Sequence, residues 1–286
     1  MRKKTDPLPR NKRAEQPPGM QFTEEDADIL VAIWRYEGVV TADQLAQIVG
    51  REKRRVQHRL TLLYHNKYIC RVDDTNKDIA HRRGMFWLAG KGAQIVAARL
   101  GDEGDFRYPK SPRWDQIAHT LRLNNVRLKM MADTSQIYGA EIRDWVSDYE
   151  FSQWPDVVVY ETTLRKGRER VLGKQKREVR PDGYCYLTTP AEAGKSYHYR
   201  LLIELDMATE NKRGQFGRDK VQPLTAYLEN PEGFQKQFGK SGMILVVTTT
   251  PTRLANIKRQ SEEYGGKGYF FEASKLLGLM TKPWTF

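Results

Sequence analysis

The sequence predicts a mixed α+β protein built from two domains. Its 286 residues are about the length that two domains require. Segments with helical and strand-like apolar spacing fall into two blocks, and residues 101–113 between them contain Gly101, Gly104, Pro109 and Pro112, which is typical of a linker. We therefore expect one domain up to residue 100 and a second over residues 114–286.

The N-terminal segment differs in composition from both blocks. Residues 1–21 hold six Lys or Arg and four Pro but almost nothing apolar. Such a segment cannot bury enough surface to become ordered, so the sequence predicts a flexible basic arm. The arm could contact phosphate groups as a disordered tail, or it could be a solvated terminus.

Two helices open the first domain, residues 22–100. Thr23 is followed by three acids, and an N-cap hydroxyl with first-turn acids suits the positive end of a helix dipole. Gly38 ends this helix. Thr41 begins a second, short helix with another hydroxyl cap, and Gly50 closes it.

A third helix is predicted over residues 51–66. Val56, Leu60 and Leu63 recur at helical spacing and face inward. The outward face carries Arg51, Lys53, Arg54, Arg55 and Arg59, with Gln57 and His58. This face could be a solvated surface over a small helical bundle, or it could contact DNA. Five cations within nine residues favour DNA.

Two strands, over residues 68–72 and 85–88, flank a basic loop, and a last helix covers residues 91–100. Three helices followed by a two-stranded hairpin is the order of a winged helix-turn-helix. We therefore predict a winged helix that binds double-stranded DNA. Its predicted DNA-binding residues are Arg51, Lys53, Arg54, Arg55, His58, Arg59, Arg82 and Arg83.

The second domain is predicted to alternate helices and strands around a central mixed sheet. A helix begins near Ile117, and the order that follows is β-β-β-α-β and then α-β. The strands are expected at residues 140–146, 182–187, 199–206, 243–249 and 269–272, and the helices at 220–229 and 253–264. The strand over residues 243–249 is uniformly apolar, which predicts an internal position in the sheet.

Charge and composition indicate the class of partner. The chain has 48 basic and 36 acidic residues, a formal net charge of +12, which favours polyanions. The excess lies in residues 2–13, 51–59 and 165–180, the last with eight Lys or Arg against two Glu.

Cys70 and Cys185 lie in apolar contexts and are expected to be reduced core residues. No apolar run approaches the ~20 residues that span a bilayer, so the sequence predicts a cytoplasmic protein.

Two acidic motifs lie on neighbouring strands of the second domain. One is Arg180-Pro181-Asp182-Gly183, and the other is Leu202-Ile203-Glu204-Leu205-Asp206. Glu204 and Asp206 share one face of their strand, because side chains alternate with a period of two. Burying carboxylates beside apolar residues is costly unless a metal, a cation or a reacting group compensates. If the strands pair, we expect Asp182, Glu204 and Asp206 to converge near Lys220.

This order of elements, with Pro-Asp before one strand and Glu-x-acid on the next, resembles the PD-(D/E)XK nuclease superfamily. In that superfamily the acids bind Mg²⁺ and a strand Lys orients the attacking water. The resemblance assigns Asp182 and Glu204 to the metal-binding positions. Asp206 stands where the Lys is expected and cannot supply a positive charge, unless Lys220 on the next helix replaces it. The implied catalytic residues are Asp182, Glu204, Asp206 and Lys220.

The whole chain is also similar to the replication-relaxation family of plasmids and integrative elements, which joins a winged helix to a degenerate nuclease-like domain. The motifs are His119 with Leu121-Arg122-Leu123-Asn124-Asn125, the two acidic motifs, Thr209-Glu210, and Lys220 with Tyr227. The resemblance covers about residues 22–275. It implies a role in replication, mobilisation or gene control on mobile DNA.

The favoured function is therefore a DNA-binding protein of a mobile genetic element, with a degenerate nuclease-like domain and replication, mobilisation or recombination proteins as partners. The alternative is a Mg²⁺-dependent endonuclease targeted by the winged helix, since two or three carboxylates with water suit Mg²⁺. A third option is a structural network in which Glu204 or Asp206 pairs with Arg180, Arg213 or Lys220. A palindromic DNA site would require a homodimer.

Overall fold

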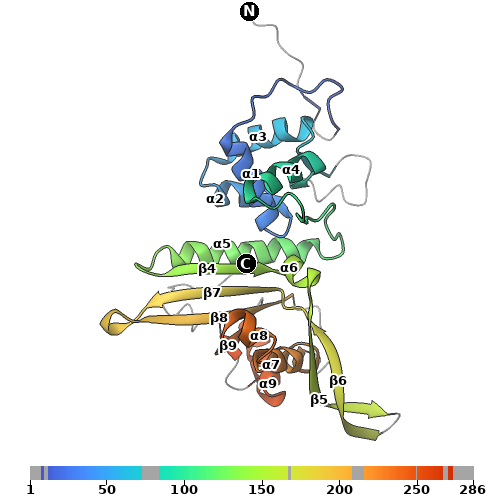
Figure 1. The fold of residues 1–286 in the computed structure, drawn as a ribbon, viewed down its shortest axis with the longest axis vertical. Coiled ribbons are helices and arrows are strands. Elements are labelled where there is room, and N and C mark those ends of the chain that lie inside the picture. The colour runs from blue at the N-terminus through green and yellow to red at the C-terminus, as the bar shows by residue number, and fades with distance from the viewer. Residues whose placement is uncertain are drawn as a thin grey trace, which may run out of the picture. The chain divides into compact units, whose positions relative to one another are not determined.

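The computed structural model describes residues 8–9, 12–72, 84–166, 169–207, 216–248, 250–266 and 270–272. The chain divides into two compact units, Met1–Leu128 and Lys129–Phe286, each of which is treated by itself below (Figure 1). Both contain helices and sheets, so the predicted mixed α+β class is confirmed. Within the described part of the chain, no helix has the length and apolar character needed to cross a bilayer.

The N-terminal unit contains a short three-stranded sheet and five helical segments among its described residues. Its elements are α1 (Glu24–Arg35), β1 (Val39–Thr41), α2 (Ala42–Ile48), α3 (Lys53–His65), β2 (Ile69–Arg71), β3 (Met85–Leu88), α4 (Gly90–Leu100) and the first part of α5 (Ile117–Thr134). The helices and the two later strands were predicted from the sequence. Strand β1 was not; it pairs antiparallel with β3 and gives the sheet order β1-β3-β2.

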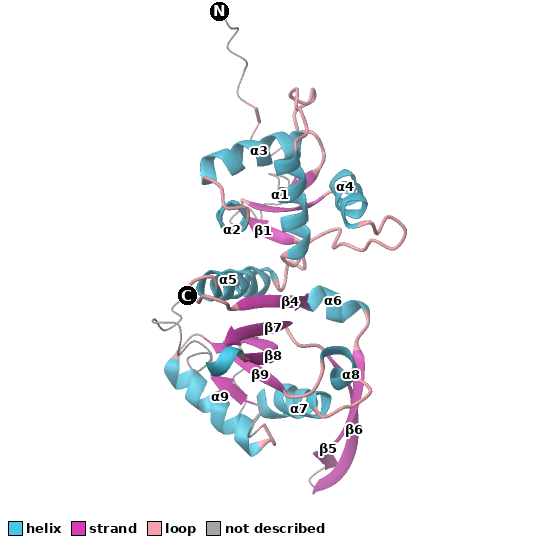
Figure 2. Cartoon of the chain, turned by 60° about the vertical axis from the view of Figure 1, so that its left-hand side comes forward, coloured by secondary structure: helices cyan, strands magenta, loops and turns pink. Residues whose placement is uncertain are grey.

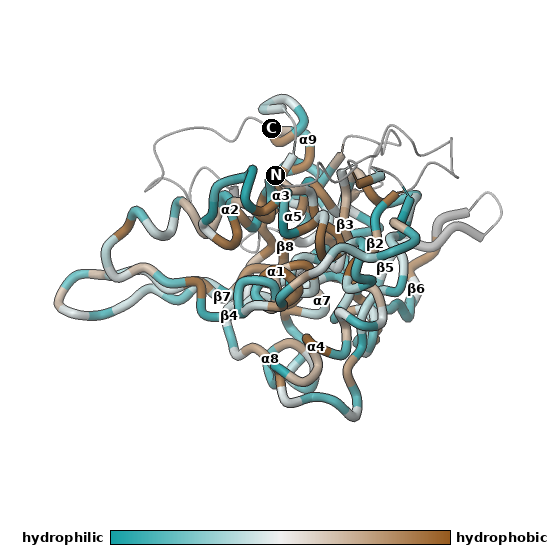
Figure 3. Tube along the Cα trace, turned by 90° about the horizontal axis from the view of Figure 1, so that it is seen from above, coloured by the Kyte–Doolittle hydropathy of each residue, from teal (hydrophilic) through white to brown (hydrophobic). Residues whose placement is uncertain are grey.

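Capping and apolar spacing explain these helices. Thr41 Oγ1 accepts a hydrogen bond from Gln44 N at 3.2 Å, and Gln44 Oε1 accepts one from Thr41 N at 3.0 Å, so α2 begins with two reciprocal bonds. In Figure 3, α3 changes between hydrophilic and hydrophobic residues along its length. Its apolar side chains Val56, Leu60 and Leu63 are buried in the core of the unit.

Polar contacts extend this unit beyond the predicted residues 22–100. In the segment predicted as a flexible arm, Ala14 N donates to His65 Nδ1 at 3.0 Å, and the guanidinium of Arg13 lies 4.6 Å from the ring centroid of Tyr64. At the other end, the buried Asn124 Nδ2 donates to the carbonyl oxygen of Val39 at 2.9 Å. Hydrogen bonds and a cation–π contact therefore hold residues on both sides of the predicted 22–100 boundaries against this unit.

The C-terminal unit is organised around a five-stranded mixed sheet with the order β10-β9-β8-β7-β4. Its strands are β4 (Glu141–Ser147), β7 (Gly183–Pro190), β8 (Ser196–Asp206), β9 (Gly242–Thr248) and β10 (Phe270–Glu272). β7 pairs antiparallel with both β4 and β8, whereas β8, β9 and β10 are parallel. All five were predicted, and β9 has the internal position that its apolar sequence indicated.

Helices pack against the sheet of this unit (Figure 2). They are α7 (Gln222–Leu228), α8 (Phe234–Phe238) and α9 (Pro251–Glu263), and α6 (Asp148–Gln153) follows β4. Leu224 of α7 and Ile257 of α9 are buried in one core with Leu202 and Val246 of the sheet. Cys185 is buried and Cys70 is half-buried, and both are thiols, as predicted.

A separate two-stranded sheet was not predicted. β5 (Asp156–Lys166) and β6 (Glu169–Val179) pair antiparallel in continuous register from Asp156 opposite Val179 to Lys166 opposite Glu169. We call this pair the β5–β6 ribbon. Figure 1 shows it as the yellow-green arm whose far end extends beyond α7.

Candidate functional site

The pairing of β7 with β8 positions the two predicted acids. Asp182 directly precedes β7, where its backbone N–H donates to Ile203 O at 3.0 Å. Its carboxylate Oδ2 accepts a hydrogen bond from Leu205 N at 2.7 Å. Asp182 is thus tied to the residues on both sides of Glu204, whose side chain is only 2% exposed. The expected juxtaposition of the two acids is a feature of the structure.

Lys220 supplies a cation to both acids. Its Nζ lies 2.7 Å from Glu204 Oε2 and 3.9 Å from Asp182 Oδ1. Its side chain is 30% exposed, so the ammonium bridges from the buried carboxylates to solvent. The predicted proximity of Lys220 to Asp182 and Glu204 is therefore confirmed.

A π-helical turn over Gly217–Val221 carries Lys220. The Gln222 N–H bonds to Gly217 O, five residues back. Pro223 has no N–H to continue the ordinary helical ladder, which favours such a local change of winding. Gly217 is also required sterically, because a Cβ there would lie 2.3 Å from the ring of Tyr264. Pro223 on one side and the close contact of Gly217 with Tyr264 on the other therefore fix the backbone conformation at Lys220.

Asp206 belongs to a different group. Arg253 at the start of α9 donates to it from Nε and Nη2, both at 2.8 Å, and Thr248 Oγ1 donates to Oδ2 at 2.7 Å. Its carboxylate is 2% exposed. Asp206, which the sequence resemblance placed where a Lys is expected, already has its own cation in Arg253. Asp182 and Glu204 therefore contact Lys220, whereas Asp206 contacts Thr248 of β9 and Arg253 of α9.

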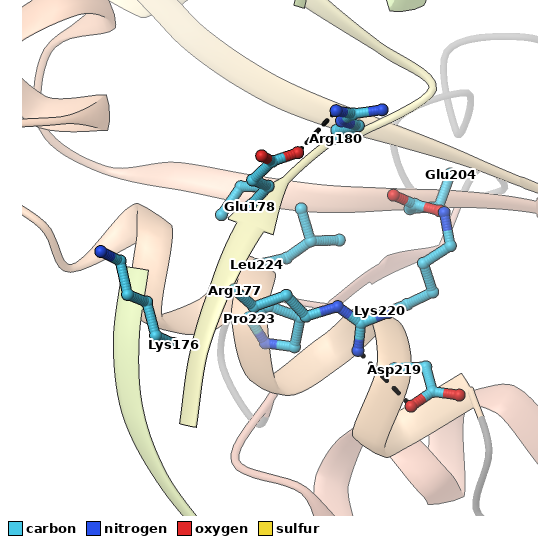
Figure 4. A pocket seen from close by; sticks show the side chains of 10 residues that line it. Lys176, Arg177, Glu178, Arg180, Glu204, Asp219, Lys220, Pro223 and Leu224 are labelled. Carbon is cyan, nitrogen blue, oxygen red and sulfur yellow. Dashed lines mark hydrogen bonds and ion pairs between the residues drawn. The ribbon is translucent and has the colours of Figure 1, made fainter. Parts of the chain in front are cut away.

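A cavity of about 470 Å³ opens beside this group (Figure 4). Glu204 and Lys220 line one side, and residues 176–180 of β6 and its end line the other. Across the cavity wall, Arg177 Nη1 lies 3.4 Å from Asp219 Oδ1. Two acids of α6, Asp148 and Glu150, are not among the residues that line it, and Glu150 caps α6 through Ser147.

The acid pair fits Mg²⁺ in donor chemistry. Mg²⁺ takes oxygen ligands and is commonly held by one or two carboxylates together with substrate phosphates. Asp182 and Glu204 supply two carboxylates, and Lys220 could then neutralise the phosphate. Within the described ranges, no group of three or more His, Cys, Asp or Glu is placed to hold a metal. The residues therefore fit a metal ion whose remaining ligands come from water and a substrate phosphate. They do not fit a metal ion that is coordinated by protein side chains alone.

Tyr227, another residue of the family resemblance, links α7 to the β5–β6 ribbon. Its hydroxyl donates to Asp156 Oδ2 at 2.6 Å, and Gln237 Nε2 donates to the same oxygen at 2.9 Å. Burial and the Asp156 hydrogen bond raise the pKa of Tyr227 above its ordinary value. The hydroxyl therefore remains protonated and fixes the first residue of β5.

The predicted DNA-binding residues on α3 and directly before it separate into two sets. Lys53 pairs with Asp43 at 2.6 Å, Arg55 pairs with Glu25 at 2.6 Å, and Arg59 pairs with the fully buried Asp26. The Asp26 hydrogen bond raises the pKa of Arg59. Arg51, Arg54 and His58 are exposed, and no ion pair joins them to another described residue. Arg82 and Arg83 lie outside the described residues.

Comparison with known proteins supports the resemblance at the level of the family. No curated protein and no solved structure matches the chain. The family model described as replication-relaxation matches residues 32–242, which include α3, Asp182, Glu204 and Lys220. Because this match covers well over half of the sequence, the chain belongs to the replication-relaxation family.

Proposed function

We propose that the chain is a DNA-binding protein that acts in the replication of mobile genetic elements such as plasmids. Membership of the replication-relaxation family supports the biological role. The N-terminal unit is proposed to be a winged helix-turn-helix, with α2 and α3 as its helix pair and β2 and β3 as its hairpin. The order of its described elements and the short α2–α3 connection around Gly50 support this assignment.

The exposed face of α3 carries this proposal. Arg54, Gln57 and His58 occupy positions i, i+3 and i+4, so they share one solvent-facing side of the helix. Arg can donate two hydrogen bonds to guanine and Gln can pair with adenine in the major groove. A recognition helix needs such side chains to be exposed, whereas Arg55 and Arg59 are engaged with Glu25 and Asp26.

A binding titration with matched arginine variants tests the proposal. Arg54→Ala with His58→Ala should weaken binding of the full chain to duplex DNA. Loss of the Arg54 phosphate or base contact should cost about 1–3 kcal/mol. Arg55→Ala removes the same charge from the same helix, but its guanidinium is paired with Glu25, so a smaller loss is expected. Equal affinities of wild type and the double variant would remove α3 from the interface.

A second candidate function is a Mg²⁺-dependent endonuclease, and the position of Lys220 favours it. The C-terminal unit is proposed to have the PD-(D/E)XK-like fold, supported by three antiparallel strands β4, β7 and β8 followed by the parallel strand β9. Lys220 brings to Asp182 and Glu204 the cation that the sequence lacks at Asp206. Mg²⁺ held by Asp182 and Glu204 would polarise a phosphate oxygen.

Incubation of the purified chain with supercoiled plasmid and Mg²⁺ or Mn²⁺ tests this second function. Nicking that disappears in both Asp182→Ala and Lys220→Ala supports an endonuclease. The control Asp219→Ala changes a half-exposed acid beside the same cavity. If the plasmid stays intact with the wild-type chain and either metal, the endonuclease is contradicted and the first proposal, a DNA-binding protein with a degenerate pocket, is retained.

A further inference from the structure

The cavity beside Glu204 has a wall with two arginines that the proposed metal chemistry does not use. Arg177 belongs to β6, and Arg180 follows the end of that strand. Both side chains line the cavity together with Glu204 and Lys220. In Figure 4, Arg180 lies above Leu224 and Arg177 lies below it. The β5–β6 ribbon therefore brings two guanidinium groups to the cavity that the acid pair borders.

Each of these arginines is paired with an acid that remains open to solvent. Arg180 Nη2 lies 2.5 Å from Glu178 Oε2, and both side chains are about half exposed. Arg177 Nη1 lies 3.4 Å from Asp219 Oδ1, and these two side chains are 36% and 40% exposed. Ion pairs at such exposure contribute little to stability, because water screens them. Both guanidinium groups can therefore exchange their carboxylate partner for another anion.

The side chains around the cavity indicate that this anion is a phosphate. Among the side chains that line the cavity, four are cationic and three are acidic. Arg binds phosphate through two parallel hydrogen bonds, which match the spacing of the phosphate oxygens. The acid pair Asp182 and Glu204 suits Mg²⁺, which is commonly held together with substrate phosphates. A strand with one phosphate at the acid pair carries further phosphates on either side of it, and the two arginines border the same cavity.

The size of the cavity limits how nucleic acid can enter it. Its volume is about 470 Å³, whereas the major groove of B-DNA alone is about 12 Å wide. A double helix therefore cannot enter this space, but the backbone of one strand can. We propose that Arg177 and Arg180 form a subsite for the phosphodiester backbone of a single nucleic-acid strand. This inference rests on the second proposed function and deepens it, because it names a substrate contact of the same site.

The test measures binding of a fluorescein-labelled single-stranded DNA of four nucleotides to the full chain by fluorescence anisotropy at several salt concentrations. The solutions contain EDTA, so that no metal-dependent cleavage alters the probe. Arg177→Ala with Arg180→Ala, the cavity variant, removes the proposed contacts. Arg143→Ala with Arg259→Ala is the matched control, because these arginines are about half exposed and each is paired with an acid, but neither lines the cavity.

The cavity variant should show a shallower slope of log affinity against log salt. The slope should change by about 1.4, because each phosphate contact with a single strand contributes about 0.7. That change corresponds to roughly a tenfold loss of affinity at about 0.15 M salt. The control variant should keep the wild-type slope and affinity. Equal slopes and affinities for the cavity variant and the control would overturn the proposal.

Two further variants separate a phosphate contact from a structural role of the arginines. Arg177→Lys with Arg180→Lys keeps both charges but loses the bidentate geometry, so it should restore the wild-type salt slope and only part of the affinity. Glu178→Gln removes the acid that engages Arg180 and should raise the affinity for the strand. Circular dichroism checks that each variant is folded. A lysine variant with the slope of the alanine variant, or a folded Glu178→Gln variant that binds no more tightly than wild type, would contradict the subsite.

The same measurements distinguish this proposal from the proposed functions. The α3 variant Arg54→Ala with His58→Ala should bind the short strand as the wild type does, because its proposed contact is with a duplex. Strand binding that depends on Arg177 and Arg180, without any plasmid nicking, contradicts the endonuclease and supports the subsite. Plasmid nicking by the wild type, with equal strand affinity in the wild type and the cavity variant, contradicts the subsite and supports the endonuclease.

Discussion

Arg253 donates two hydrogen bonds to the carboxylate of Asp206, from Nε to Oδ2 and from Nη2 to Oδ1, each at 2.8 Å. This bidentate pair ties the first turn of α9 to the end of β8. It neutralises an acid at the position where the sequence resemblance led us to expect a Lys, and Asp206 is not among the residues that line the cavity. Asp206 is neutralised from α9, and the pocket receives its cation from Lys220.

Removing Arg253 should destabilise the C-terminal unit. Arg253→Ala leaves the carboxylate of Asp206, which is 2% exposed, buried without its cation. The expected loss in free energy of unfolding is about 3–5 kcal/mol. The control Arg259→Ala, on the same helix, breaks an exposed pair with Glu263 and should cost about 1 kcal/mol or less. Urea denaturation measures the free energy of unfolding of both variants. Equal losses would show that the buried Arg253–Asp206 pair stabilises the unit no more than an exposed ion pair does.

The Lys220 contact predicts a response to Mg²⁺ that does not depend on cleavage. Lys220→Met keeps most of the side-chain length but removes the ammonium from Glu204 and Asp182, so the variant should be less stable than wild type by about 3 kcal/mol. Mg²⁺ should then stabilise the variant more than the wild type, because it binds the vacated carboxylates in the folded state only. Thermal unfolding with and without Mg²⁺ measures this. If Mg²⁺ stabilised neither protein, that result would count against a metal at this pair.

The N-terminal unit should lose stability as the pH falls below about 6.5. Burial, and then the charges of Arg71 and Arg13, lower the pKa of His65 from its ordinary value of 6.5. The unfolded chain therefore binds a proton that the folded chain resists. The contribution of His65 is complete above pH 6.5 and declines below it by at most about 1.4 kcal/mol per pH unit. His65→Gln introduces a neutral side chain that keeps a hydrogen-bond acceptor, so the variant should lose less stability below pH 6.5 in denaturation experiments. An unchanged profile would show that other groups cause the loss of stability.

The contacts of Ala14 and Asn124 predict which N-terminal fragment folds. A fragment of residues 12–134 retains the Ala14–His65 bond and the Asn124–Val39 bond, whereas residues 21–100 retain neither. The longer fragment should unfold cooperatively and at a higher temperature in circular dichroism. A shorter fragment of equal stability would show that these polar contacts are incidental.

Much of the fold could be predicted because its signals are local. Thr23, Thr41 and Gly50 mark helix ends, and the apolar run of β9 indicates an internal strand. The pairing of Asp182 with Glu204 followed from two short motifs on adjacent strands. The β5–β6 ribbon was also detectable in principle, since Val157 to Leu164 is rich in β-branched residues.

Other features depend on partners distant in sequence. Arg253 lies 47 positions from Asp206, and nothing in its own helix pattern indicates that pair. Likewise, the ion pairs of Arg55 with Glu25 and of Arg59 with Asp26 are invisible in a helix considered alone. The sequence therefore predicted a uniformly available basic face, whereas tertiary contacts engage part of it and leave Arg54 and His58 to the solvent.

The claim that α3 contacts DNA is tested most directly by placing a photo-reactive amino acid at position 57. Gln57 lies between Arg54 and His58 on the exposed face, and Gln94 on α4 is an exposed residue of the same type. Irradiation with duplex DNA should give a covalent protein–DNA adduct from position 57 and little from position 94. Adducts of equal yield from the two positions, or from position 94 alone, would contradict the account.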